Sequence, residues 1–163
     1  MVCTFFGHRN VPSGVRVALE AVLIDLIENK GADVFYVGNH GEYDRFVRDV
    51  LRQLKGRYPH IRYAIVLAYM PTVRDAYLYK DTETLYPEGL ERVPPKFAIS
   101  KRNRWMVEQA DMAITYVVNN YGGAAQFQGM ARRKGKTVIN LYEQEKISQK
   151  NPLICGFFCS FVL

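Results

Sequence analysis

Short apolar runs alternate along the chain with segments whose apolar residues recur every three or four positions. The apolar runs, which the pattern predicts to be strands, cover residues 2–6, 33–37, 63–69, 112–118 and 137–141. Helical spacing is clearest in Val15, Leu19, Val22 and Leu26, before Gly31, and in the set Phe46, Val47, Val50, Leu51 and Leu54. Because the runs are nearly all apolar, we expect helices on both faces of a mostly parallel sheet of about five strands. The fold class is therefore α/β.

Two segments break this alternation. Residues 70–96 carry Pro71, Pro87, Pro94 and Pro95 together with three tyrosines, and they predict a long irregular loop. We expect such a loop after a strand to form a lid or one wall of a site, or to pack on its own tyrosines as a surface loop. From residue 142 the periodicity is lost, so we divide the chain into a domain, residues 1–142, and a C-terminal tail, residues 143–163. The apolar end of the tail should be covered by the domain or by a second subunit.

Composition narrows the functional classes. The chain has 163 residues, a net charge of +6 and three cysteines. That length suits one compact domain, and the cysteine spacing indicates neither a disulfide framework nor a metal site, so we expect no metal and no cofactor. No apolar run approaches the ~20 residues of a membrane span, and the N-terminus lacks a signal-peptide layout, so we expect a cytoplasmic protein. The positive charge suits a nucleic acid or a small phosphorylated ligand.

The loops after the first two predicted strands carry candidate site residues. Gly7, His8 and Arg9 follow the first strand, where the glycine allows close approach and the other two side chains can hold a phosphate or a base edge. A structural histidine that contacts a backbone carbonyl is the alternative for His8. Because the carboxyl ends of parallel strands meet at one sheet edge, the second loop should lie beside the first.

After the second strand the sequence places Gly38, Asn39 and His40 in a turn, and Glu42 and Asp44 in the first turn of a helix. Acidic residues there complement the helix dipole, so simple capping explains them. The alternative is that Glu42 or Asp44 accepts hydrogen bonds from ribose hydroxyls.

The largest group of candidate phosphate-binding residues lies between residue 99 and residue 131. If a helix begins near Ser100, then Lys101, Arg102 and Arg104 crowd its first turn, where a bound anion would offset their conflict with the helix dipole. If the helix begins near Pro95, these residues lie within the helix and the argument weakens. A second turn, with Gly122, Gly123 and Ala124, leads into another helix and leaves room for a phosphate to approach backbone N–H groups.

These motifs together resemble the SLOG superfamily. The resemblance rests on residues 7–9, 35–38, 101–107, 110–125 and 135–141. It implies a Rossmann-like three-layer sandwich, related to Lonely Guy phosphoribohydrolases and DNA-processing A-type proteins, and a nucleotide-derived ligand. Related domains commonly pair, so the resemblance also implies a homodimer.

One motif departs from the Lonely Guy pattern. Those enzymes carry an Arg, which corresponds to Arg102, and a Gly-Gly-x-Gly-Thr-x-x-Glu signature. Here the third glycine corresponds to Ala125, the threonine to Gln126 and the catalytic glutamate to Gly129, with Gln128 beside it. An oxocarbenium-like transition state needs a carboxylate, which neither residue supplies.

Three functions follow from these observations. We expect the domain to sense or sequester a nucleotide-derived small molecule, such as an ADP-ribose derivative or a mononucleotide, with its phosphate at Arg102, Arg104 and the Gly122–Gly123 turn. The alternative is an N-glycosidase or deoxyribosyltransferase-like enzyme that takes its carboxylate from Glu42 or Asp44. A weaker alternative is binding of single-stranded nucleic acid through the basic surface.

Overall fold

The computed structural model describes residues 1–73 and 78–150, and its centre is a parallel sheet. The six strands are β1 (Val2–Gly7), β2 (Val34–Val37), β3 (Arg62–Val66), β4 (Glu83–Leu85), β5 (Met112–Tyr116) and β6 (Thr137–Asn140), in the order β4-β3-β2-β1-β5-β6. Every neighbouring pair is parallel. The predicted α/β, Rossmann-like fold is confirmed.

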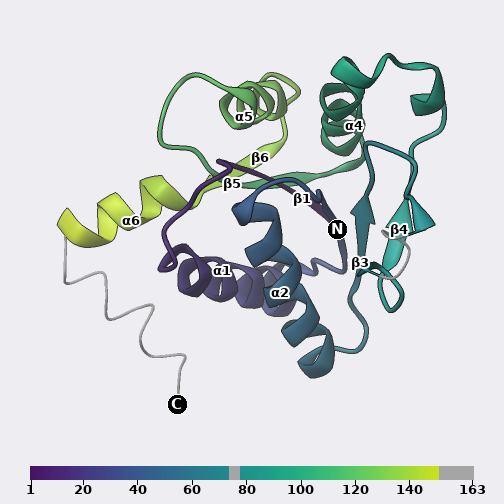
Figure 1. Ribbon diagram of the computed structural model, residues 1–163. Coiled ribbons are helices and arrows are strands. Elements are labelled where there is room, and N and C mark those ends of the chain that lie inside the picture. The colour runs from purple at the N-terminus through teal and green to yellow at the C-terminus, as the bar shows by residue number, and fades with distance from the viewer. Residues whose placement is uncertain (74–77, 151–163) are drawn as a thin grey trace.

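Helices cover both faces of the sheet (Figure 1). On one face lie α1 (Val15–Lys30) and α2 (Glu42–Arg57), and on the other lie α4 (Pro95–Gln109) and α5 (Gly123–Arg133). The helix α6 (Leu141–Lys150) packs against β5 and α1. Within residues 1–73 and 78–150, no helix is both long and apolar enough to cross a membrane.

Each face of the sheet has its own apolar core. The larger core joins α1 and α2 to the sheet through residues such as Leu19, Leu23 and Val47, all fully buried. The smaller core joins α4 and α5 to the sheet through Met106, Val107 and Phe127. These buried faces explain why the strands read as continuous apolar runs rather than as alternating ones.

The structure differs from the sequence-based expectations in one segment and adds detail in two others. The segment predicted to be irregular contains the strand β4, which pairs with β3, and a 3-10 turn at Leu90–Arg92. The C-terminal tail begins within α6, while residues 151–163 lie outside the described residues. The helix α4 begins at Pro95 rather than near Ser100, because a proline is well suited to the first turn of a helix.

The strand order fixes where a ligand site can form. Chain order runs outward from β1 through β2, β3 and β4 on one side, and through β5 and β6 on the other. Open α/β sheets bind ligands outside the carboxyl ends of the strands at such a switch point. Gly7 at the end of β1 is opposite Tyr116 at the end of β5, so the loops after these strands begin side by side.

Candidate functional site

A cavity of about 290 Å³ lies at this edge of the sheet, between the loops after β1 and β2 and the helices α4 and α5. It is lined by the following residues that the sequence singled out: Gly7, His8, Arg9, Gly38, His40, Asp44, Arg102, Gly123 and Ala124. The other candidates, Asn39, Glu42, Arg104 and Gly122, do not line it. The cavity thus brings together residues from four separate segments, and ligand binding by these residues stays a prediction.

One face of α4 supplies cavity residues that the sequence reasoning missed. Ile99, Asn103 and Met106 line the cavity beside Arg102. Their spacing of three and four residues places them on a single helix face, so a helix that starts at Pro95 would have predicted them. The strand residues Phe5 and Phe6 complete the wall.

The helix start at Pro95 changes the argument for the arginines. Lys101, Arg102 and Arg104 lie in the middle of α4, so they do not oppose the dipole at its first turn, and the argument that depended on a start near Ser100 does not apply. Arg104 is exposed and does not line the cavity with Arg102. Arg102, by contrast, is 2% exposed and forms part of the cavity wall.

Arg102 is held by the sheet but keeps one donor free. Its Nη1 donates a hydrogen bond to the carbonyl of Val66 at the end of β3, at 2.7 Å. Its Nε is buried and has no partner among the described residues. Burial lowers the pKa of the guanidinium, and the nearby carboxylate of Asp44 partly offsets this effect. A guanidinium remains charged in proteins even when burial lowers its pKa. The cavity wall therefore contains a buried cation, and one of its hydrogen-bond donors, Nε, has no partner among the described residues.

Gly7 and Gly38 make room for protein side chains. A Cβ at Gly7 would overlap the ring of Tyr43, and one at Gly38 would overlap Asp44 Oδ2 and lie 2.8 Å from Arg102 Nη1. Their lack of a side chain therefore lets the start of α2 and the side chain of Arg102 pack closely against the sheet edge. The sequence-based interpretation of Gly7 considered only approach by a ligand.

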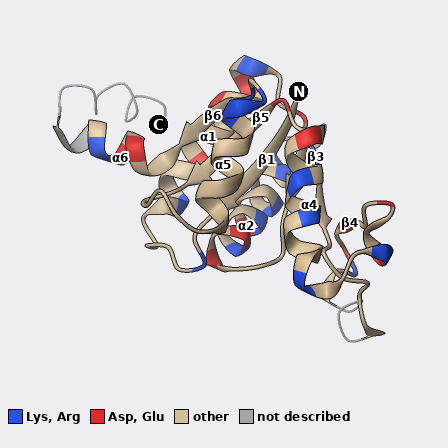
Figure 2. Ribbon diagram, turned by 90° about the horizontal axis from the view of Figure 1, so that it is seen from above, with Lys and Arg blue, Asp and Glu red and all other residues tan. Residues whose placement is uncertain are grey.

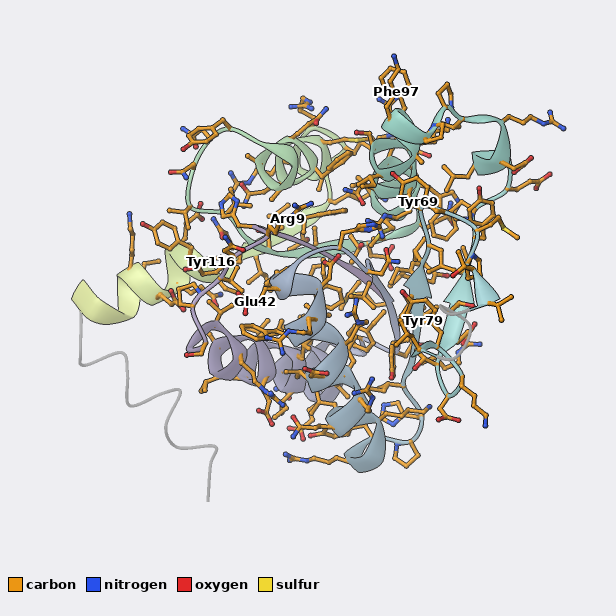
Figure 3. The ribbon with its side chains drawn as sticks, in the orientation of Figure 1. Arg9, Glu42, Tyr69, Tyr79, Phe97 and Tyr116 are labelled. Atoms are coloured by element: carbon orange, nitrogen blue, oxygen red, sulfur yellow. The ribbon has the colours of Figure 1, made fainter. Side chains whose placement is uncertain are left out.

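The two acidic residues at the start of α2 have different environments. Glu42 accepts a hydrogen bond from the N–H of Val11 at 3.2 Å and forms an ion pair with Arg45 at 3.2 Å. The carbonyl of Arg9, which Figure 3 labels together with Glu42, accepts the backbone N–H of Glu42 at 2.8 Å. Glu42 therefore fixes the loop after β1 to α2.

Asp44 lies inside the cavity wall. Its side chain is buried, and Oδ2 accepts the N–H of His40 at 3.0 Å. Burial raises the pKa of this carboxyl, and the charges of Arg102 and Arg48 together with the N–H of His40 partly offset the rise. Asp44 is the acidic side chain in the wall of this cavity among the described residues.

The two histidines of the site have different partners. His8 Nε2 accepts the N–H of Val118 at 2.9 Å, so it ties the loop after β1 to the loop after β5. His40 Nδ1 is buried without a partner among the described residues. Burial lowers the pKa of His40, and the positive charges of Arg102, Arg9 and Arg48 lower it further. Three guanidinium groups therefore lie close enough to His40 to lower its pKa.

The N-terminus of α5 forms the remaining wall. Gly122 has a φ of 89°, a conformation that favours glycine, and Gly123 is the first residue of the helix. The first turn of α5 holds no acidic residue and no side-chain cap. The first N–H groups of a helix have no acceptor within the helix, so they are available to an anion.

The position beside the expected glutamate has a structural role. Gln128 is buried, and its Nε2 donates to Thr115 Oγ1 of β5 at 2.8 Å. It does not line the cavity. A second, more open hollow of about 660 Å³ lies on the other side of the α5 N-terminus, and its wall includes Tyr121, Gly122, Gly123, Gly129 and Arg133.

The described residues contain no cluster of three or more His, Cys, Asp or Glu side chains that could hold a metal ion.

The helix α4 carries an excess of positive charge. Its basic residues are Lys96, Lys101, Arg102 and Arg104, and its acidic residue is Glu108, near its end. Figure 2 shows this excess along the helix.

Comparison with known proteins gives a fold-level similarity. No protein-family model and no curated protein sequence matches this chain. Among solved structures, the chain is similar to DNA processing protein A (DprA) from Streptococcus pneumoniae, with a TM-score of 0.63 and 18% sequence identity. The similarity covers 83% of this chain and 48% of that chain, so this chain spans about half the length of its structural neighbour. The neighbour has the Rossmann-like fold described above.

Proposed function

We propose that this chain binds a nucleotide-derived small molecule and holds its phosphate at the N-terminus of α5. The observation that carries the proposal is that Gly123 and Ala124, at the start of α5, line the same cavity as the buried Arg102 with its unpartnered Nε. Helix N-termini and guanidinium groups both commonly bind phosphate in proteins.

The charges around the cavity support an anionic ligand. Arg9, Arg48 and Arg102 act on His40, while Asp44 is the acidic side chain in the cavity wall. The excess of positive charge is partly buried, where it is screened less than on the surface. A phosphate in the cavity would offset this positive charge.

The rest of a nucleotide has a place in the same cavity. Asp44 faces it from the start of α2, where a carboxylate accepts hydrogen bonds from ribose hydroxyls in dinucleotide sites. The relation to the SLOG superfamily, and the homodimer that it implies, belong to this proposal as well.

The enzymatic alternative is an N-glycosidase or a related transferase, and one observation favours Asp44 over Glu42 as its carboxylate. Asp44 lines the cavity with a pKa raised by burial, whereas the side chain of Glu42 is engaged by Val11 and Arg45 outside it. In a hydrolysis, the bond between the base and the ribose breaks, and water supplies the new oxygen on the sugar and the proton that leaves with the base. A carboxylate stabilises the positive charge of that transition state.

A nucleic-acid role is the third candidate. The structural neighbour is named for processing DNA, and the basic helix α4 would suit a phosphate backbone. Binding of an oligothymidylate that falls steeply as salt rises would support this role, and an affinity independent of salt would contradict it.

The experiment that separates these functions identifies what the protein retains. Purified protein is incubated with nucleoside monophosphates, NAD and cyclic ADP-ribose, freed of unbound ligand and denatured, and the released molecules are identified by mass spectrometry. An intact, enriched nucleotide supports the proposal. A free base with ribose phosphate supports the glycosidase, and release of base should then be lost in Asp44→Asn and kept in Glu42→Gln. Retention of no nucleotide contradicts both.

A further inference from the structure

Two hollows adjoin the N-terminus of α5, and Ala124, which lines the first, lies on a different face of the helix from Ala125, Gly129 and Arg133, which line the second. The cavity described above is lined by Gly123 and Ala124, and the second hollow is lined by Gly122, Gly123 and Ala125. Gly123 belongs to both walls. A phosphate held by the first N–H groups of α5 therefore has space on both sides, and the buried Arg102, whose Nε has no partner among the described residues, lines the first of the two hollows.

The first hollow is small for a complete ligand. Its volume of about 290 Å³ lies at the lower limit of the ~300–1,000 Å³ that typical small-molecule sites enclose. A ligand that places its phosphate at α5 and one nucleoside in this cavity fills the available space, so any further group must lie across the helix terminus.

Arg133 provides a cation on that second side. It is in the last turn of α5, yet its Nη1 lies 3.3 Å from the point where a Cβ of Gly129 would stand, one turn nearer the N-terminus. Glycine is among the poorest helix formers, so helix stability does not explain Gly129. Its missing side chain gives the Arg133 guanidinium room to lie along the wall of the second hollow.

Tyr121 provides an aromatic surface beside it. This residue directly precedes the Gly122–Gly123 turn, lines the second hollow and is 75% exposed. Exposed aromatic rings next to a phosphate site are platforms on which bases stack in nucleotide-binding proteins. A cation, a ring and helix N–H groups thus surround the second hollow.

We infer that the phosphate bound at α5 is esterified on both sides, so that one nucleoside occupies the Arg102 cavity and a second sugar or base occupies the Tyr121 and Arg133 hollow. The inference rests on the proposed phosphate site and adds the class of ligand: a bridging phosphate or pyrophosphate rather than a mononucleotide. Two sources share this chemistry, namely a pyrophosphate-linked small molecule and a step of single-stranded nucleic acid.

Calorimetric titration with AMP, ADP-ribose and the dinucleotide pTpT tests the inference. We expect ADP-ribose or pTpT, or both, to bind the full-length protein at least about tenfold more tightly than AMP. The ligand that gains identifies the source. In Arg133→Gln and Tyr121→Ala that gain should fall by about tenfold while the affinity for AMP stays unchanged.

Matched variants control for folding and for general charge. Arg132→Gln removes a neighbouring cation outside the hollow, and Tyr121→Phe keeps the ring, so both should bind as the wild type does. Equal affinity for all three ligands would overturn the inference. Equal losses of affinity for ADP-ribose or pTpT in Arg132→Gln and Arg133→Gln would also overturn it. In either case, binding of AMP would leave the proposed function standing. Absence of binding to all three would overturn both.

Discussion

Gly38 shows how a single residue shapes this site from within. It lies against Asp44 and Arg102, which come from different helices on opposite faces of the sheet. Because both side chains are buried, neither can move aside into solvent. The sequence shows that a glycine is present at this position, and the structure shows which side chains require it.

Replacing Gly38 with alanine should therefore destabilise the protein by about 1 to 3 kcal/mol, because the added methyl group overlaps Asp44 and Arg102. Gly56→Ala is the matched control, since Gly56 lies in α2 with no atom within 4 Å of an added Cβ, and it should stabilise the helix by up to about 1 kcal/mol. Urea unfolding measures both changes. A Gly38→Ala protein as stable as the Gly56→Ala protein would contradict the packing described here.

His40 provides a titration signal for the ligand. Its pKa is lowered by burial and by the charges of Arg102, Arg9 and Arg48, so the folded protein favours neutral His40. The free energy of unfolding therefore decreases as pH falls below the pKa of about 6.5 that histidine has in the unfolded chain. A bound phosphate adds negative charge beside these guanidinium groups, so we expect the pKa of His40 to rise on AMP binding. NMR titration of the imidazole with and without AMP measures this, and an unchanged or lower pKa would speak against a phosphate in this cavity.

At the scale of elements, the position of α5 depends on the strand that follows it. Asn140, at the end of β6, donates from Nδ2 to the carbonyl of Val117 at 2.9 Å and accepts the N–H of Val117 through Oδ1 at 3.0 Å. Both bonds are buried and hold the chain just after β5, where it begins to approach the Gly122–Gly123 turn. A side chain thus takes the place of a strand partner beyond the end of the sheet.

Asn140→Ala should lower the free energy of unfolding by about 2 to 4 kcal/mol, because it leaves two buried backbone groups of Val117 without partners. Asn119→Ala, at an exposed position of the same loop, should change it by less than about 0.5 kcal/mol. Thermal and urea denaturation monitored by circular dichroism compare the two. Similar stabilities for both variants would show that the Asn140 bonds do not restrain the loop.

At the scale of the whole molecule, the apolar pattern was sufficient for the layers and the parallel sheet. It could not show β4, because three residues are too few to establish a period, and their pairing with β3 is a long-range contact. Two start signals competed in α4, a serine at position 100 and a proline at position 95, and the proline marks the true start. With the start at Pro95, Ile99 belongs to the helix and lies on the same face as Arg102, Asn103 and Met106, which line the cavity.

The candidate site, too, was predictable from the sequence only in part. The carboxyl-end rule for parallel sheets predicted that the loops after β1, β2 and β5 would meet, and the structure brings them together. The sequence could not separate Asp44 from Glu42, because both satisfy the same dipole rule and only packing buries one of them. Nor could it show that Arg102 keeps an unpartnered donor, since this depends on where the Val66 carbonyl lies.

The most direct test of the phosphate site is to measure AMP binding by calorimetry in Gly123→Asp and Gly123→Asn, together with their unfolding free energies. An added Cβ at Gly123 meets no atom within 4 Å, so both variants should fold. Aspartate at the first helix position should raise stability by about 0.3 to 1 kcal/mol over asparagine, while its charge repels the phosphate. We expect a more stable Gly123→Asp protein that binds AMP at least about tenfold more weakly than Gly123→Asn. Equal AMP binding by the two variants would contradict it.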